Sequence, residues 1–383
     1  MSARRRAVGP VSPASEQLEM RCLFAAAGGL DPHAPPTAVA DLNDDGRDDL
    51  VVVTVDAARG GGGTAVGLDV YLNDGKGAFR FAGHTGCDDA DGVVAAEIAA
   101  GTNRVINGDG STSQWPVLAL KLYSVTGQPT PVGDVAGRAT LALFDGDGKG
   151  GLAHRRTHVI PHLFETGDRR CRSDPYAETA QRGLAVADLN GDRLADVASW
   201  VGDQLVVGIA GAGGDLKMGP AQSNPLYAPT GKEGVNPLYE NRMVGAGDLD
   251  GDGRADLVAV VGGAVRYLSV DSGAERPVGG RVTEVEAVTV RRKAAVRLAD
   301  VDGDGGADDL VVVDGQKVSV GVNAQDATRH RFTWTQLGPV GFATRDALVG
   351  DADGDGRDDL FGISNVTKTR HDVAMNSVRN LKA

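Results

Sequence analysis

Five short segments of the sequence place aspartate or asparagine at every second position. They begin at Asp41, Asp188, Asp248, Asp300 and Asp351, and each has a further aspartate four residues after the third alternating position. Alternate side chains of a tight loop point inward, and a hard dication such as Ca²⁺ takes six to eight oxygen ligands on a flexible backbone. The segments therefore predict about four to five Ca²⁺ ions, and we name each loop by its first residue.

Each loop would supply side-chain oxygens from positions 1, 3, 5 and 9 and a backbone carbonyl from position 7. In chain order these candidate ligands are Asp41, Asn43, Asp45, Arg47 and Asp49; Asp188, Asn190, Asp192, Leu194 and Asp196; Asp248, Asp250, Asp252, Arg254 and Asp256; Asp300, Asp302, Asp304, Gly306 and Asp308; Asp351, Asp353, Asp355, Arg357 and Asp359. Position 6 must turn sharply, which glycine does without strain. The Asp188 loop has Arg193 there, so we expect it to be weaker or irregular.

Other loops that open with the same pattern fit less well. An EF-hand needs glutamate at position 12 and a helix on each side, and dockerin-type loops also lead into helices. Position 12 is Val52, Ser199, Ala259, Val311 or Gly362, and the flanking residues are β-branched. A metal-free acidic turn is the remaining alternative, which the mutual repulsion of several close carboxylates disfavours.

The charge distribution supports the same interpretation. The five loops carry a formal charge of −18, which leaves +5 for the remainder of a chain whose total is −13. The negative charge is thus concentrated where cations could neutralise it. An acidic chain without a basic face does not suit nucleic acid as a partner, and no run of 18 apolar residues could span a membrane.

The acidic loops also mark a repeat. Successive loops start 147, 60, 52 and 51 residues apart, and a period near 50 indicates stacked units that each need a neighbour to bury their apolar face. A short apolar strand enters each loop and a second leaves it. The clearest later strands are Lys317–Val322, after the turn at Asp314-Gly315, and Phe79–Phe81.

Four antiparallel strands in each repeat describe one blade of an all-β propeller. At the common spacing, the first interval should hold two blades, so we expect a seven-bladed β-propeller. Six blades are the alternative, if that interval is one blade with insertions. Residues 89–92, 107–110 and 145–148 are candidates for degenerate loops there, although the last could equally be a hairpin between the third and fourth strands of a blade.

The loops and the strands that follow them resemble the FG-GAP/VCBS repeats of integrin-α-type propellers. The resemblance covers residues 38–383 and implies a seven-bladed propeller with Ca²⁺ in its aspartate loops, which binds or adheres and does not catalyse. We therefore expect a non-catalytic calcium-binding module at the cell surface, monomeric, with an unknown protein or glycan ligand. A polysaccharide lyase or hydrolase with its site in residues 84–182, or a lectin, are the alternatives.

Residues 1–37 lie outside the repeats. Arg4-Arg5-Arg6 precedes Leu18-Glu-Met-Arg-Cys-Leu-Phe24 and a run of alanines, which resembles the LEPR-xLL segment of exported bacterial proteins, with methionine in place of proline. Export is one prediction. The other is structural: residues 18–24 could be the fourth strand of the last blade, because the chain ends soon after its third.

Two smaller features remain open. Cys87 and Cys171 could form a disulfide or remain apart, because sequence does not show their distance. His154, His158 and His162 are four residues apart, a spacing that could bind zinc on a helix, but the β-branched residues between them favour an extended chain.

Overall fold

The computed structural model describes residues 36–56, 65–87, 93–106, 112–125, 136–165, 182–201, 204–211, 215–226, 241–270, 281–291, 294–324, 332–342, 347–364 and 373–381. All regular elements in these ranges are strands. No helix in the described part of the chain is long and apolar enough to cross a membrane. Residues 1–35, which include the segment predicted for export or ring closure, lie outside the described residues.

The strands, in chain order, are β1 (Thr37–Ala40), β2 (Asp49–Asp56), β3 (Ala65–Asn73), β4 (Ala78–Cys87), β5 (Val93–Ile106), β6 (Thr112–Val125), β7 (Ala136–Gly146), β8 (Leu152–Glu165), β9 (Arg182–Ala187), β10 (Asp196–Val201), β11 (Gln204–Ala210), β12 (Leu216–Met218), β13 (Gln222–Ser223), β14 (Asn241–Gly247), β15 (Asp256–Val261), β16 (Ala264–Leu268), β17 (Val282–Thr289), β18 (Ala295–Ala299), β19 (Asp309–Asp314), β20 (Lys317–Asn323), β21 (Phe332–Leu337), β22 (Ala347–Gly350), β23 (Asp359–Ser364) and β24 (Val373–Asn380).

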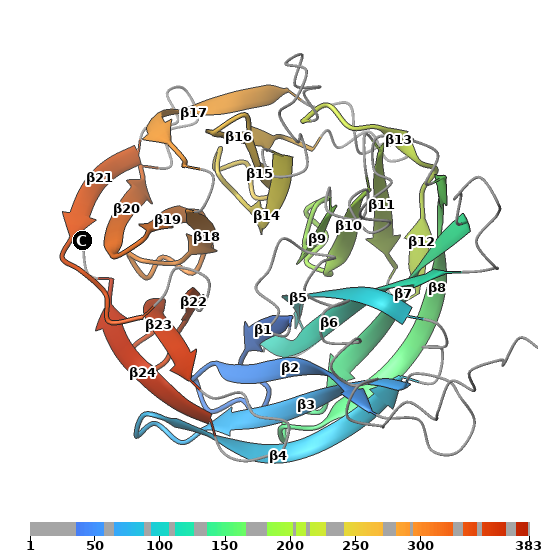
Figure 1. Cartoon of the computed structure of the whole chain (residues 1–383), viewed down its shortest axis with the longest axis horizontal. Helices are drawn as coiled ribbons and strands as arrows, with labels where there is room; N and C mark the ends of the chain where they lie inside the picture. Colours follow the sequence, from blue (N-terminus) through green and yellow to red (C-terminus); the bar gives the residue numbers. More distant parts are fainter. Residues whose placement is uncertain are drawn as a thin grey trace, which may run out of the picture.

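These strands form antiparallel sheets around a central axis (Figure 1). The orders are β5-β6-β7-β8, β12-β11-β10-β9 with β13 beside β11, β14-β15-β16-β17 and β18-β19-β20-β21; the fifth sheet has seven strands in the order β1-β2-β3-β4-β24-β23-β22. The strands β1, β5, β9, β14, β18 and β22 lie nearest the centre, and each contacts the next around the ring. The protein is therefore a β-propeller.

The expected number of blades is wrong. The described strands form five hydrogen-bonded sheets, which gives a five-bladed propeller and not one of seven or six blades. Two features of the chain account for the difference. The long interval after the Asp41 loop holds one sheet, β5–β8, whose strands β5, β6 and β8 have 14 residues each. In addition, β24 pairs with β4 through Val373–Phe79 and Ala374–Ala78, which joins the first and last strands of the chain into one sheet.

The second strand of each repeat is buried on both faces. All six residues of β15 (Asp256–Val261) are buried, and so are the first five of β19 (Asp309–Asp314). This explains why the sequence shows continuous runs of valine and leucine there instead of alternation. The strands predicted on either side of the acidic loops are confirmed. Residues 145–148 span the end of β7 and the start of the turn into β8, as the hairpin alternative held.

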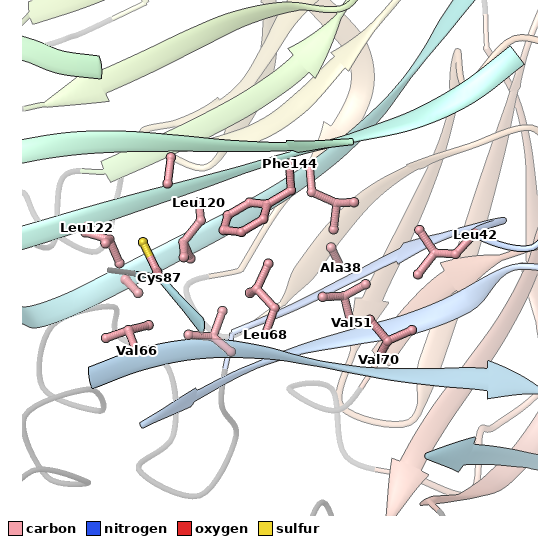
Figure 2. Close-up of a cluster of buried hydrophobic side chains, with 14 residues drawn as sticks. Ala38, Leu42, Val51, Val66, Leu68, Val70, Cys87, Leu120, Leu122 and Phe144 are labelled. Carbon is pink, nitrogen blue, oxygen red and sulfur yellow. The ribbon is translucent and has the colours of Figure 1, made fainter. Parts of the chain in front are cut away.

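Apolar cores fill the space between neighbouring sheets. Figure 2 shows one of them, in which Val51, Leu68 and Val70 from β2 and β3 face Leu120 and Phe144 from β6 and β7. Cys87 is buried in the same cluster, while Cys171 lies outside the described residues. Five further clusters of this kind are present among the described residues. Packing between sheets therefore stabilises the ring along its whole circumference.

A pair of hydrogen bonds closes the ring between the two ends of the chain. The backbone N–H of Asp48 donates to the carbonyl of Asp351 at 2.7 Å. In return the backbone N–H of Asp351 donates to Oδ2 of Asp48 at 2.9 Å, across 303 residues of sequence. Since only two residue pairs join β4 to β24, this loop-to-loop contact is a substantial part of the closure.

We expect Asp48→Ala to destabilise the fold by about 1–3 kcal/mol, because it leaves the N–H of Asp351 without its acceptor in a partly buried place. Chemical denaturation followed by circular dichroism measures the change. Asp314→Ala, at the β19–β20 turn, is the control and should change the stability by about 0.5 kcal/mol or less. Equal effects of the two substitutions would contradict a role for Asp48 in closure.

Candidate metal centres

The five acidic loops occupy equivalent places in the fold. Each connects an innermost strand to the buried strand beside it: β1 to β2, β9 to β10, β14 to β15, β18 to β19 and β22 to β23. Because the loops follow the same strand of each repeat, they lie at the same end of the propeller. We call this set of five loops the acidic belt.

The aspartate at position 1 shapes each loop. In the Asp248 loop, Oδ1 of Asp248 accepts the N–H groups of Gly251 at 2.8 Å and Asp252 at 3.1 Å, and Oδ2 accepts that of Gly253 at 2.8 Å. Asp41, Asp188, Asp300 and Asp351 make the corresponding bonds to positions 5 and 6 of their own loops. The hydrogen bonds of the first carboxylate therefore shape the turn without any bound ion.

Position 6 has a left-handed backbone in every loop. The φ angles of Gly46, Gly253, Gly305 and Gly356 lie between 78° and 90°, and Arg193 adopts 71° at the same position. Its N–H donates to Oδ2 of Asp188 at 2.6 Å, as the glycines do in their loops. The Asp188 loop is thus regular in shape, contrary to the expected irregularity, although a left-handed backbone strains a residue with a side chain.

Three loops bring carboxylates within reach of one ion. The oxygen atoms of Asp300, Asp302 and Asp304 lie within 4.8 Å of one another, and so do those of Asp351, Asp353 and Asp355. In the Asp248 loop the group is Asp248, Asp250 and Asp256, from positions 1, 3 and 9. These spacings allow several oxygens to share a cation of the size of Ca²⁺.

Two carboxylate oxygens at these loops are buried without a hydrogen-bond partner. They are Oδ1 of Asp250, at position 3, and Oδ2 of Asp359, at position 9. A buried polar atom without a partner costs about 1–3 kcal/mol, and more when the group is charged. A cation held by Asp248, Asp250 and Asp256 would satisfy the atom of Asp250, so the residues of this loop fit a calcium ion. Asp359 is not among the three carboxylates gathered in its own loop.

The other two loops differ in composition. Each has asparagine at position 3, and in both the amide of that asparagine donates to the aspartate at position 5, Asn43 to Asp45 at 3.2 Å and Asn190 to Asp192 at 3.1 Å. Arg47 also pairs with Asp45 at 2.6 Å. Part of the negative charge at position 5 of the Asp41 loop is therefore neutralised within the loop itself.

The aspartate before the buried strand anchors each loop to its sheet. Asp49 accepts the N–H of Leu42 at 3.0 Å and that of Asn73, at the end of β3, at 2.8 Å. Asp196 makes the same two bonds, to Leu189 and Ala210. Both oxygens of these two carboxylates are thus engaged by the backbone.

In the Asp300 loop this anchor is Asp309 and not Asp308. Asp309 accepts the N–H of Val301 at 2.9 Å and that of Asn323 at 2.7 Å. The loop is one residue longer than the others, so counting from its first aspartate assigns position 9 to Asp308. Alignment on the apolar residue that opens the next strand, Leu310 here and Leu50 in the first loop, identifies Asp309 from the sequence alone.

Burial raises the pKa of these anchors well above that of an ordinary aspartate. The pKa is raised to about 7 for Asp49, Asp196 and Asp256, mainly because burial disfavours the charged form and further because other carboxylates of the loop lie close. For Asp309 and Asp359 the same causes raise the pKa to about 6. Holding these groups ionised is therefore unfavourable without a nearby positive charge.

Neighbouring loops are hydrogen-bonded to one another. The N–H at position 8 donates to the carbonyl at position 1 of the preceding loop: Ala255 to Asp188 at 2.8 Å, and Asp358 to Asp300 at 2.7 Å. The Asp48–Asp351 contact is the same bond at the closure. Asp358, like Asp48, also accepts a backbone N–H in return, that of Asp300 at 2.8 Å.

Arginines at position 7 complete the contacts between loops. Arg254 packs over Gly191, Arg357 over Gly303 and Arg47 over Gly354, in each case the glycine at position 4 of the preceding loop. A Cβ at these glycines would lie 3.1–3.4 Å from the arginine side chain. The small residue and the arginine are thus fitted to each other, and we call these three side chains the belt arginines.

The histidines spaced four residues apart do not lie on a helix. His154 and His158 lie on β8, an extended strand, as expected, and His154 hydrogen-bonds to Thr157 at 3.1 Å. The side chain of His162 is not among those described.

A separate polar group lies inside the β5–β8 sheet. Lys121 is fully buried, donates to the carbonyls of Gly183 and Trp200 and pairs with Glu97 at 3.2 Å. It ties this sheet to the next one. A side chain buried in that way is a structural link and is not placed to meet a substrate.

Comparison with known proteins gives similarities to solved structures at low sequence identity. No protein-family model and no curated protein sequence matches the chain. Among solved structures, it is similar to the Tc holotoxin pore of Photorhabdus luminescens (16% identity, TM-score 0.39), covering 94% of this chain and 15% of that one. It is also similar to TcdB2-TccC3 without its hypervariable C-terminal region (13%, TM-score 0.30), covering 87% and 17%. The chain thus spans less than a fifth of either relative.

We expect Asp309→Ala to destabilise the protein by about 2–4 kcal/mol, because two buried N–H groups lose their acceptor. Asp308→Ala is the matched control, since it removes the neighbouring carboxylate and leaves both bonds of Asp309 intact. Denaturation midpoints of the two variants measure the difference. A larger loss for Asp308→Ala would show that Asp308 is the anchor.

The raised pKa values predict how the stability of the metal-free protein depends on pH. The pKa of these aspartates is about 6–7 in the folded protein and about 3.9 when the chain is unfolded. The folded state binds their protons more tightly, so the stabilisation is fully present below the unfolded pKa and is lost as the pH rises through the folded values. In EDTA, the melting temperature should be higher near pH 5 than near pH 8; the reverse order would contradict the assignment.

Proposed function

We propose that this propeller is a calcium-stabilised, non-catalytic binding or structural module of the FG-GAP/VCBS type. The observation that carries the proposal is the arrangement of the belt. Three loops place three carboxylates each within 4.8 Å, and two of these loops also hold a buried carboxylate oxygen without a partner. Oxygen-only sites of several carboxylates on a flexible loop favour Ca²⁺ over softer metals.

The ions would stabilise the contacts between neighbouring repeats. Every loop is hydrogen-bonded at its first position or its eighth to a neighbouring element. A cation held by the gathered carboxylates, from positions 1, 3 and 5 in the Asp300 and Asp351 loops and from positions 1, 3 and 9 in the Asp248 loop, would fix the loop that makes these bonds. It would also offset the repulsion among these carboxylates. Calcium would therefore stabilise the assembled ring, and the ring would present its loops as a rigid surface to a partner.

The proposed location follows from the same chemistry. Extracellular calcium modules typically bind with dissociation constants of about 10⁻⁴–10⁻³ M, so such sites are filled where calcium is millimolar. The basic start of the chain and the LEPR-xLL-like segment agree with export. We place the working protein outside the cytoplasm, where a protein or glycan would be its ligand.

An enzyme built on residues 84–182 is the alternative. One polar group in this region, Lys121 with Glu97 and Tyr123, joins two sheets, and its lysine is 0% exposed. The described residues thus offer a structural reason for this group, and none of its geometry favours catalysis.

Removal of calcium should lower the melting temperature strongly. At tenfold excess over its dissociation constant, each ion contributes about 1.4 kcal/mol, so several sites together approach the 5–15 kcal/mol that stabilises an ordinary domain. Differential scanning calorimetry in EGTA and in calcium measures the shift, and equilibrium dialysis counts the ions, of which we expect four to five. Magnesium, which demands a tighter octahedral shell, should not substitute for calcium.

The matched variants change position 5 in the three loops that gather carboxylates. Asp252→Asn, Asp304→Asn and Asp355→Asn remove charge and keep the oxygen that accepts the N–H of position 7. The triple variant should lose about three ions and most of the calcium-dependent rise in melting temperature. Asp74→Asn with Asp147→Asn, two turn aspartates outside the belt that also accept a backbone N–H two residues further on, should lose no ion and keep the calcium-dependent rise of the wild type. Equal melting curves in EGTA and in calcium, with no ion bound, would refute the proposal.

A further inference from the structure

The acidic belt is interrupted between the Asp41 loop and the β5–β8 sheet. None of the five loops of the belt follows its innermost strand, β5. Among the described residues, β5 and β6 form a long hairpin paired as far as Ile106 and Thr112, and the candidate degenerate loop at residues 107–110 lies outside the described residues. A cavity of about 240 Å³ lies at this junction. It is large enough for one side-chain-sized group.

The two walls of the cavity differ in chemistry. The Asp41 loop contributes the carboxylate residues Asp41, Asp44 and Asp48, while the β5–β6 hairpin contributes Thr102, Gln114 and Trp115. Among the described residues that line it, none is basic. The cavity thus combines several hydrogen-bond acceptors with an aromatic ring and holds no cation of its own.

The other junctions show what the belt accepts at this place. At three of the four places where one acidic loop follows another, a belt arginine of the later loop lies over position 4 of the earlier one: Arg254 over Gly191, Arg357 over Gly303 and Arg47 over Gly354. The Asp300 loop has Gly306 at position 7 instead. At the Asp41 loop the next sheet supplies the β5–β6 hairpin, and Gln114 and Trp115 line the cavity beside position 4.

Position 4 itself differs in the Asp41 loop. The other four loops have glycine there, and this loop has Asp44, which keeps the left-handed backbone at a φ of 60°. Opposite a belt arginine a Cβ would crowd the arginine side chain. At the junction between the Asp41 loop and the β5–β8 sheet, position 4 carries the carboxylate of Asp44. This side chain occupies the place where the other loops have only a glycine.

We propose that this cavity binds a guanidinium group, the cation of an arginine side chain, supplied from outside the described part of the chain. A guanidinium offers five N–H donors and no acceptor, which matches the carboxylate of Asp44 together with the remaining lone pairs of Asp41 and Asp48. The last two carboxylates also accept backbone N–H groups, of the Asp41 loop and of Asp351. Its flat face stacks on an aromatic ring such as that of Trp115. An alkylammonium is a point charge that makes no such stack, and a neutral sugar leaves the carboxylates uncompensated.

The site is separate from the proposed calcium ligands in two of its residues. Asp41 belongs to both, but Asp44 and Trp115 are at none of the positions assigned to calcium. Substitution of these two therefore tests the guanidinium site without changing a metal ligand. All titrations are made in calcium-saturated buffer, so that the belt is the same in every sample.

Agmatine, which carries one guanidinium, is the probe, and isothermal titration calorimetry at low ionic strength measures its affinity. We expect the wild type to bind agmatine several-fold more tightly than cadaverine, which carries ammonium groups instead, and to bind methyl glucoside not at all. Asp44→Asn and Trp115→Leu should each weaken binding about tenfold, as expected for loss of a hydrogen bond to a charged group or of a stacked ring. Asn tolerates the left-handed backbone, so the first variant keeps the loop.

Two further variants make the result decisive. Asp215→Asn, an exposed aspartate that pairs with Arg156, removes the same charge elsewhere and should bind as the wild type does. Gln114→Arg places a guanidinium from the β5–β6 hairpin beside the cavity, as a belt arginine would be, and should abolish agmatine binding and raise the melting temperature. An arginine-containing tripeptide that binds more tightly than agmatine identifies a polypeptide as the source, and equal affinity identifies a free guanidinium compound. No agmatine binding, or binding that Asp44→Asn leaves unchanged, would overturn the proposal.

Discussion

The structure depends on one repeated contact, the hydrogen bond from position 8 of an acidic loop to position 1 of the loop before it. Apolar packing between sheets does not by itself set how they are arranged, because flat faces of valine and leucine can slide. A backbone hydrogen bond between loops fixes the register of one repeat against the next. Where the bond is reciprocal, at Asp48 with Asp351 and at Asp358 with Asp300, it lies at or beside the place where the two ends of the chain meet.

This contact requires several negatively charged side chains to lie close together, which is electrostatically unfavourable. The aspartates that shape and join the loops are brought together at one end of the propeller, and several of them are buried to the degree that their pKa rises toward neutrality, as for Asp49 and Asp358, both about 7. The belt arginines compensate part of this charge, since Arg47 and Arg254 lie beside aspartates of their own loops. The carboxylates that the arginines do not compensate would be stabilised by a divalent cation. Metal binding and ring assembly are thus two consequences of the same residues.

The sequence predicted the strands around each loop because their apolar runs and the loop residues are local signals. It also predicted that residues 145–148 could lie in a hairpin, since the alternation of aspartate and glycine found there is common in turns. It did not predict the number of sheets, because the pairing of β4 with β24 joins segments almost 300 residues apart and leaves no local trace. Asp309 was missed for a different reason: an inserted residue shifts a count from the first aspartate, while the sheet keeps its register from the strand that follows. The inter-loop bonds could not be predicted, since they depend on backbone groups that every residue has.

The β5–β8 sheet shows how a repeat is joined to its neighbour without an acidic loop of the belt. At the β5–β8 sheet the chain replaces an acidic loop by a hairpin, and the side chain of Asn103 supplies the acceptor for Ala195 that a position-1 carbonyl supplies elsewhere. The fold therefore remains joined there without a loop, a cation site or a belt arginine. A repeat that no longer needs these residues for assembly can change at this place without loss of the ring. The Asp41 loop still faces this place with carboxylates, and the cavity they share with Trp115 has no belt arginine among its lining residues. The proposed guanidinium site uses this combination of acidic groups and an aromatic ring.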